Sequence, residues 1–468
     1  MKLAYKRAHL FILLFFLNLI IFIKIFPSFF YVDEFDLIYS QRFSSIPELF
    51  SRVVHSSLSY LMRPTYYLVF GIYYKIFLFN MMYCYVLPFL AHFIAAISMY
   101  YFLLRDEEDT SFAAIGSILF LVYCGVWEAV GSISGILYPM AAIFLLNAFT
   151  CYFKKRYGLS FLLFALALFT HQVSIMFVPM VLIYEWIVNG RKMSAGSFKG
   201  LYASSLLTVI YLIFYFVRKL FFHAAPLEDK YFFGPHFFKN ELNYIATLFV
   251  PVITSYKMQA IFPGLMIKVI DIVKLAVACL SPLGALAVFF YGPKKARFFT
   301  IWVLLTLLPF TFFITPPVSR YLYIASIGYV ALVALFIDHL LKNNRLKKAG
   351  ILLFTVLFIG NLGAMVTYQK LFYNKKEVRR QILKDVMAQT PKLRLHSRIC
   401  FIDLPIRDDE IKNMIYLWYK GDNYRISTIN ADNAACEQTY DPKIKYKYDY
   451  VFVYKCAEKK VKLVSGHD

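Results

Sequence analysis

Charged residues are scarce in this 468-residue chain: they make up 17% of the sequence, whereas hydrophobic residues make up 60%. The mean hydropathy is +0.59. A soluble domain is usually about 25% charged and about 45–50% apolar. The shortage of charge excludes a soluble enzyme, a disordered chain and a collagen-like fibre, and it predicts that most of the chain lies in lipid.

Acidic residues are scarcer than basic ones, 28 against 50, which gives a formal net charge of +22. In a soluble protein this excess would suggest nucleic acid binding. Here the Lys and Arg residues stand in short bursts between apolar stretches, which is typical of a multi-span membrane protein. We therefore expect the lipid bilayer as a partner and no nucleic acid.

The seven cysteines include no CxxC pair, and the chain has no Asn-x-Ser/Thr site and no fixed-period repeat. The sequence thus carries no zinc or redox signature and no support for a glycosylated luminal protein. We expect neither an organic cofactor nor a metal. The acids that follow the first apolar run leave a divalent cation as an open alternative.

Long apolar runs predict eleven membrane-spanning helices. The first run follows Lys2, Lys6 and Arg7 and ends near Phe26 without a small-x-small cleavage site, so we interpret it as a retained span with a cytoplasmic N-terminus. The later spans are expected at approximately 82–104, 111–127, 136–153, 157–170, 173–189, 200–222, 263–291, 297–315, 319–341 and 348–369.

The distribution of basic residues predicts the orientation of these spans. Four short loops hold 13 Lys and Arg residues, and the opposing short loops hold Arg320 alone. The basic loops, which we place in the cytoplasm, are 154–158, 190–199, 292–297 and 342–348. A further span over the short apolar segment 64–79 would invert this pattern, so we expect that segment outside as a juxtamembrane helix.

The expected fold is an all-α polytopic membrane protein with a small C-terminal extracytoplasmic α/β domain. Residues 1–373 would form the membrane domain, with outer loops at 31–81 and 223–262. Residues 374–468 are more polar and contain strand-like runs such as Arg398–Ile402.

Acidic residues directly follow the first predicted span. Asp33, Glu34 and Asp36 stand at the start of the first outer loop, which continues to Arg63 before Pro64. Carboxylates at the mouth of a membrane cavity can act as a general base or hold a metal ion. The alternative is a solvated helix end.

Three later outer connections also carry polar residues. His171 and Gln172 join two short helices, and the first has 14 residues that rise about 21 Å against a hydrocarbon core of about 30 Å. We expect this pair below the membrane surface, as cavity lining or as a buried structural pair. Glu128 follows another span, and its two interpretations are a residue that lines a cavity and a residue that ends a helix. Arg320, followed by Tyr321, suits phosphate recognition, with snorkelling as the alternative.

In this order the features resemble GT-C-fold glycosyltransferases, over about residues 8–370. The families that the chain resembles are the protein O-mannosyltransferases and the lipid A aminoarabinose transferase type. The resemblance rests on the acids after span one, the Arg63-Pro64 pair, Glu128, a polar pair before a proline-containing span, and the late Arg-Tyr-Leu-Tyr. Those families often have Lys-Glu or His-Glu where this chain has His171-Gln172.

The resemblance implies an inverting hexosyl- or pentosyltransferase that uses a polyprenyl-phosphate-sugar donor and a lipid, glycan or protein acceptor. Its active site would face the outside of a bacterial inner membrane. Asp33 or Glu34 would be the catalytic base. The substrate-binding residues would be Asp36, Arg63, Glu128, His171, Gln172, Arg320 and Tyr321. The alternatives are an outer-face glycan polymerase or ligase and a lipid-linked sugar flippase or transporter.

Overall fold

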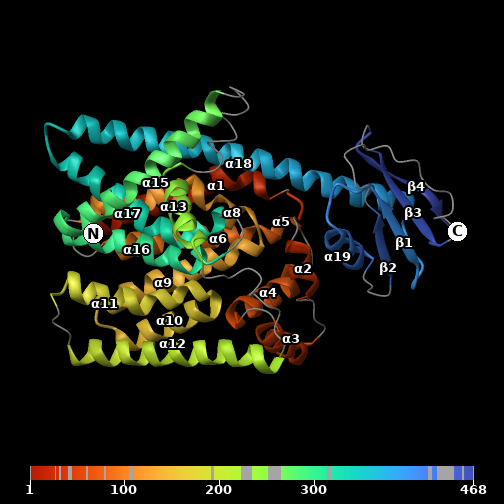
Figure 1. Ribbon diagram of the computed structural model, residues 1–468, viewed down its shortest axis with the longest axis horizontal. Coiled ribbons are helices and arrows are strands. Elements are labelled where there is room, and N and C mark those ends of the chain that lie inside the picture. Colours follow the sequence, from red (N-terminus) through yellow and green to blue (C-terminus); the bar gives the residue numbers. More distant parts are fainter. Residues whose placement is uncertain are drawn as a thin grey trace.

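A bundle of long helices and a small mixed sheet make up the computed structural model, and the last helix of the bundle leads into the sheet (Figure 1). The structure describes residues 2–26, 28–30, 33–40, 45–59, 62–77, 81–104, 109–190, 194–222, 234–250, 265–313, 318–419, 424–429, 447–455 and 458–466. Within these ranges, the side chains at 2–6, 33, 36, 40, 73, 74, 77, 81, 82, 219–222, 265–271 and 371 are outside the description.

A helix stands at each of the eleven positions where the sequence predicts a span. The helices are α1 (Lys2–Phe22), α6 (Val86–Leu103), α7 (Thr110–Val122), α9 (Leu137–Phe153), α10 (Tyr157–Thr170), α11 (Phe177–Ile187), α12 (Ala195–Phe222), α15 (Leu265–Tyr291), α16 (Lys294–Thr311), α17 (Leu322–Lys342) and α18 (Lys347–Gln389). Within the described ranges, seven helices are long and apolar enough to cross a membrane, or eight if α7 and its bent continuation form one span. The pair α10 and α11 is shorter, and α16 opens with cations.

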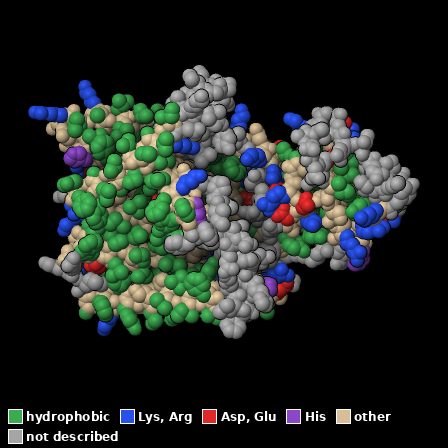
Figure 2. Space-filling view, viewed as in Figure 1, with side chains coloured by type: hydrophobic (Ala, Val, Ile, Leu, Met, Phe, Trp, Pro, Cys, Tyr) green, Lys and Arg blue, Asp and Glu red, His purple; other side chains and the backbone are tan. Residues whose placement is uncertain are grey.

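Large apolar side chains cover the outside of the bundle as well as its core. The buried centre includes Phe102, Phe149 and Trp302, whose rings contact one another. On the outside, α15 exposes Leu275 and Leu280 by 65% and 63%. Figure 2 shows hydrophobic side chains over this face of the bundle, while acidic and basic ones gather toward the C-terminal part. An apolar surface of this extent is stable in lipid rather than in water, so the chain is an integral membrane protein.

Three short helices of the first predicted outer loop lie at one end of the bundle, and they are α2 (Asp33–Ser40), α3 (Ile46–Ser59) and α4 (Pro64–Phe77). α4 packs against α3 and α10. The Arg218 guanidinium of α12 donates hydrogen bonds to the Ser57 and Leu58 carbonyls, at 3.2 and 3.5 Å. These two bonds cap the C-terminal end of α3, where helix carbonyls lack partners within the helix. The membrane-spanning α12 thereby fixes α3 in place.

The C-terminal sheet has the strand order β2-β1-β3-β4. Its elements are β1 (Arg398–Ile402), α19 (Asp408–Trp418), β2 (Arg425–Ile429), β3 (Tyr450–Lys455) and β4 (Lys460–Gly466). β1 pairs in parallel with β2 and β3, and β4 is antiparallel to β3. The central β1 and β3 are almost continuously apolar because both faces of a central parallel strand are covered. This arrangement is the small α/β domain that the sequence predicts.

Helix α18 continues from the membrane bundle into the C-terminal part without a break, over 43 residues. Its polar second half stays helical because Ile382, Leu383 and Val386, spaced three and four residues apart, are buried. The helix ends at Gln389, before Thr390 and Pro391, where a proline disfavours helical backbone in the residue before it. The predicted domain division at residue 373 therefore falls inside a helix, and it remains a prediction.

Candidate active site

A short connection between α8 (Trp127–Gly131) and α9 lies at the centre of the polar groups. Its Gly131 carbonyl accepts a hydrogen bond from α18, its Ile133 N–H donates one to α2, and its Ser134 carbonyl accepts one from Tyr66 of α4. A Cβ on Gly135 would lie 2.6 Å from the Ala129 carbonyl oxygen, so this backbone folds tightly on itself. The connection thus joins the first predicted outer loop to the end of the bundle.

Glu34 is fully buried, and its carboxylate is held on both oxygens. Oε1 accepts from the Ile133 N–H at 2.7 Å, and Oε2 accepts from the Tyr85 hydroxyl at 3.0 Å. The Lys376 ammonium of α18 lies 3.8 Å from Oε1. These contacts direct the carboxylate into the protein.

Asp33 opens α2, and Asp36 follows within its first turn. The side chains of both residues lie outside the described part of the chain. Their roles therefore remain predictions that rest on the sequence and on the position of α2.

The structure brings Arg63 and Gln172 together. The Arg63 Nε and Nη2 atoms both donate to the Gln172 side-chain oxygen, at 3.0 and 2.8 Å. This partner is neutral, and no ion pair joins Arg63 to a carboxylate among the described residues. Among the described residues, the half-buried guanidinium thus has a neutral hydrogen-bond partner and no carboxylate partner.

His171 is 1% exposed and presents one unused nitrogen. Its Nδ1 accepts from the Val173 N–H at 3.1 Å, which assigns the hydrogen of the neutral ring to Nε2. Nε2 has no hydrogen-bond partner among the described residues. Buried donors are rarely left unpaired, so this N–H is available to a bound group. Both Arg63 and Arg320 lie within electrostatic range of the ring.

Glu128 and Arg320 form a second charged pair. The Glu128 Oε2 accepts from the Ser319 hydroxyl at 2.5 Å and from the Arg320 backbone N–H at 3.2 Å. The Arg320 Nε lies 3.9 Å from Glu128 Oε1. Glu128 thus fixes the start of the short helix η7 (Ser319–Tyr321) and offsets part of the Arg320 charge.

Aromatic rings lie next to these two pairs. Tyr321 stacks on Phe310 with 4.5 Å between ring centroids, and Tyr138 contacts His171 at 4.8 Å. The Tyr138 hydroxyl lies within electrostatic range of both Arg63 and Arg320. Tyr138, in the first turn of α9, therefore lies near both arginines.

Several predicted residues gather in one place, which we call the polar cluster. It consists of Arg63, Glu128, His171, Gln172, Arg320 and Tyr321. Tyr138, which lies beside His171 in the first turn of α9, and the buried Lys376 were not predicted from the sequence. The predicted outer loop 223–262 is described only over 234–250, where Asn240 of α13 (His236–Phe249) donates to the Thr311 and Phe313 carbonyls at the end of α16.

The membrane bundle has a GT-C-like fold, as a comparison with solved structures shows. The solved structure of ArnT from Cupriavidus metallidurans in the apo state, a lipid A aminoarabinose transferase, superposes with a TM-score of 0.52 over 92% of this chain and 87% of that one. The two sequences are 11% identical. The predicted GT-C-like membrane fold is thereby confirmed.

Comparisons of sequence alone find nothing: no family model and no curated protein matches the chain.

Proposed function

We propose that the protein transfers a sugar from a polyprenyl-phosphate-linked donor to an acceptor hydroxyl on the outer face of a bacterial inner membrane. The observation that supports this proposal is the polar cluster at one end of a GT-C-like bundle. Among the described residues, its Arg63 has no carboxylate partner and its buried His171 Nε2–H has no hydrogen-bond partner.

The cluster suits a phosphate group. Arg63 contributes a positive charge whose described partner is neutral, Arg320 a charge that Glu128 partly offsets, and His171 Nε2 a neutral donor. Guanidinium groups bind phosphate through paired, charge-assisted hydrogen bonds. The nearby Tyr321 and Phe310 rings give the site an apolar wall next to these charges.

In the proposed reaction, Asp33 takes the proton from the acceptor hydroxyl while that oxygen attacks the anomeric carbon of the donor sugar. The bond between the anomeric carbon and the phosphate oxygen breaks, and polyprenyl phosphate leaves with the electron pair. Arg63 and Arg320 stabilise the negative charge that develops on the leaving phosphate. The attack inverts the anomeric carbon.

Glu34 has a supporting role in this proposal. Its carboxylate is fully buried and already accepts two hydrogen bonds beside Lys376. A general base must reach the proton that it removes. We therefore assign the base to Asp33 rather than to Glu34.

Undecaprenyl phosphate tests the proposal without knowledge of the sugar, because every donor of this class releases a polyprenyl phosphate. We expect it to bind the full-length protein in lipid nanodiscs, as measured by native mass spectrometry. The Arg63→Gln variant should bind it more weakly. Equal binding of undecaprenol, which lacks the phosphate, would contradict phosphate recognition and overturn the proposal.

The outward orientation has its own test. Lys154 and Lys392 are exposed at opposite ends of the predicted topology. Single cysteines at these two positions, in a background without other reactive cysteines, should show opposite labelling by a membrane-impermeant maleimide in intact cells. Protection of residue 392 would place the proposed site on the cytoplasmic side.

A further inference from the structure

A lysine of helix α18 is buried beneath the first outer loop. Lys376 is 2% exposed, and its ammonium donates to the Gly131 carbonyl at 2.9 Å and to the Tyr85 hydroxyl. It also lies 3.8 Å from the fully buried Glu34 carboxylate. Two opposite charges have thus been removed from water at one point.

Such a pair contributes little to stability, because the cost of desolvating two charges offsets their attraction. Its better-attested effect is to fix one arrangement of the elements that carry the charges. Glu34 is the second residue of α2, directly after Asp33. The ion pair therefore fixes the start of the helix that carries the proposed base.

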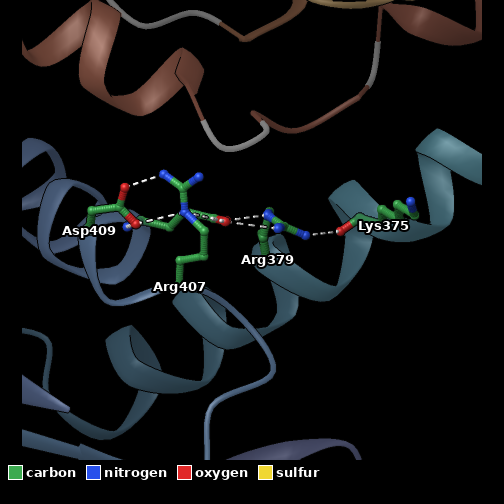
Figure 3. Close-up of polar contacts among 5 residues, drawn as sticks. Lys375, Arg379, Arg407 and Asp409 are labelled. Atoms are coloured by element: carbon green, nitrogen blue, oxygen red, sulfur yellow. Dashed lines mark hydrogen bonds and ion pairs between the residues drawn. The ribbon is translucent and has the colours of Figure 1, made fainter. Parts of the chain in front are cut away.

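The C-terminal end of α2 is also connected to α18, through helix α19 of the C-terminal domain. Arg379, one turn after Lys376, donates to both Glu410 oxygens of α19 at 2.6 and 3.1 Å. α19 in turn packs against α2, where the Tyr39 and Tyr416 rings lie 5.7 Å apart. Figure 3 shows Arg379 of α18 facing Arg407 and Asp409 at the start of α19.

Resting on the function proposed above, we propose that Lys376 is a positioning residue for Asp33. Through Glu34 it sets the first turn of α2, so that Asp33 stands where the acceptor hydroxyl is deprotonated. Arg379 and Glu410 support the far end of α2 through α19. The C-terminal domain is accordingly part of the catalytic unit.

The test is a set of full-length variants in nanodiscs: Lys376→Met, Glu34→Gln, and the two combined. The matched control is Lys375→Met, because Lys375 precedes Lys376 on α18 but is exposed. Two readouts apply: hydrogen exchange of residues 33–40 in the nanodiscs, and turnover of undecaprenyl-phosphate-linked hexose and pentose donors by membranes of cells that express each variant.

Lys376→Met removes the ammonium that lies 3.8 Å from the buried Glu34 carboxylate. We expect at least tenfold faster exchange over residues 33–40 and at least tenfold slower turnover, with the affinity for undecaprenyl phosphate changed less than twofold. Adding Glu34→Gln removes the buried carboxylate charge as well, so the double variant should recover at least part of the slow exchange and of the turnover. Lys375→Met should change neither readout.

Unchanged exchange over residues 33–40 in Lys376→Met would overturn the proposal. So would a double variant that exchanges slowly but stays as inactive as Glu34→Gln, because Glu34 would then act in the chemistry. If Lys376→Met does not fold, the hydrogen exchange and turnover of the double variant are compared with those of Glu34→Gln instead. Failure of the wild type to bind undecaprenyl phosphate would refute the proposed function. The comparison of hydrogen exchange over residues 33–40 would still test whether Lys376 fixes the position of α2.

Discussion

The Arg63 guanidinium and the Gln172 side-chain oxygen form a two-point hydrogen bond of 3.0 and 2.8 Å, although the residues are 109 positions apart. An amide oxygen orients a guanidinium without neutralising it. An acidic residue at position 172, as the resembling families often have, would cancel much of this charge. The glutamine is therefore consistent with an arginine that is reserved for an anionic ligand.

The first prediction ranks the two arginines of the polar cluster. Arg63→Gln should weaken binding of undecaprenyl phosphate by about 1.5–3 kcal/mol, or roughly 10- to 100-fold in Kd. Arg320→Gln should weaken it less, because Glu128 already offsets part of that charge. Arg52→Gln, which removes an arginine paired with Glu48 on α3, is the control. A larger loss in Arg320→Gln than in Arg63→Gln would reverse the assignment.

The second prediction concerns the base. Asp33→Asn should lower turnover by roughly 10²–10⁴, the usual cost of losing a general base. Binding of undecaprenyl phosphate should persist, because Asp33 does not hold the phosphate in this mechanism. Single-turnover release of polyprenyl phosphate, followed by mass spectrometry, measures the effect. Near-normal turnover in both Asp33→Asn and Glu34→Gln would remove the first loop from the chemistry.

The third prediction concerns Cys400, in the central strand β1. Burial raises the pKa of its thiol to about 11, from the usual 9.0. Only the thiolate reacts with maleimide, so labelling in the native protein at pH 7.5 should be about 100-fold slower than for an ordinary thiol. Peptide mass spectrometry should find rapid labelling after unfolding in dodecyl sulfate. Equal rates before and after unfolding would contradict the burial.

The sign of the linked pH effect follows from the same shift. Between pH 9 and 11 the Cys400 thiol ionises in the unfolded chain but stays protonated in the folded one. Unfolding is favoured as the pH rises through this window. The C-terminal domain should therefore lose stability there, and Cys400→Ala should reduce that loss.

Apolar runs predicted the helices well because, in lipid, a backbone must satisfy its own hydrogen bonds. Apolar runs did not reveal which residues fix the position of α2. Lys375 and Lys376 resemble a solvated pair after the last span, and only the register of α18 shows that Lys376 is the buried one. Neighbouring side chains on a helix point about 100° apart.

The polar cluster was predictable as a set of residues but not as a set of pairs. Polar residues at the ends of apolar runs marked Glu128 and Arg320 in advance. Their contact joins positions 192 residues apart, which no local pattern encodes. The contact of Arg320 with Glu128, and hence the prediction that Arg63 contributes more to phosphate binding, follows only from the folded structure.

The last prediction concerns the tight connection that joins α2, α4 and α18. In Gly135→Ala the new Cβ would lie 2.6 Å from the Ala129 carbonyl oxygen and 2.8 Å from its Cα, which are backbone atoms with little room to move. Forcing an extra methyl group into such a place costs about 1–3 kcal/mol. The shift would also move the Ile133 N–H that binds Glu34. We expect a lower unfolding temperature together with slower turnover. Gly158→Ala on α10 is the control, since no atom lies within 4 Å of a Cβ there. Equal thermal shifts in the two variants would show that the connection tolerates the displacement and does not set the position of α2.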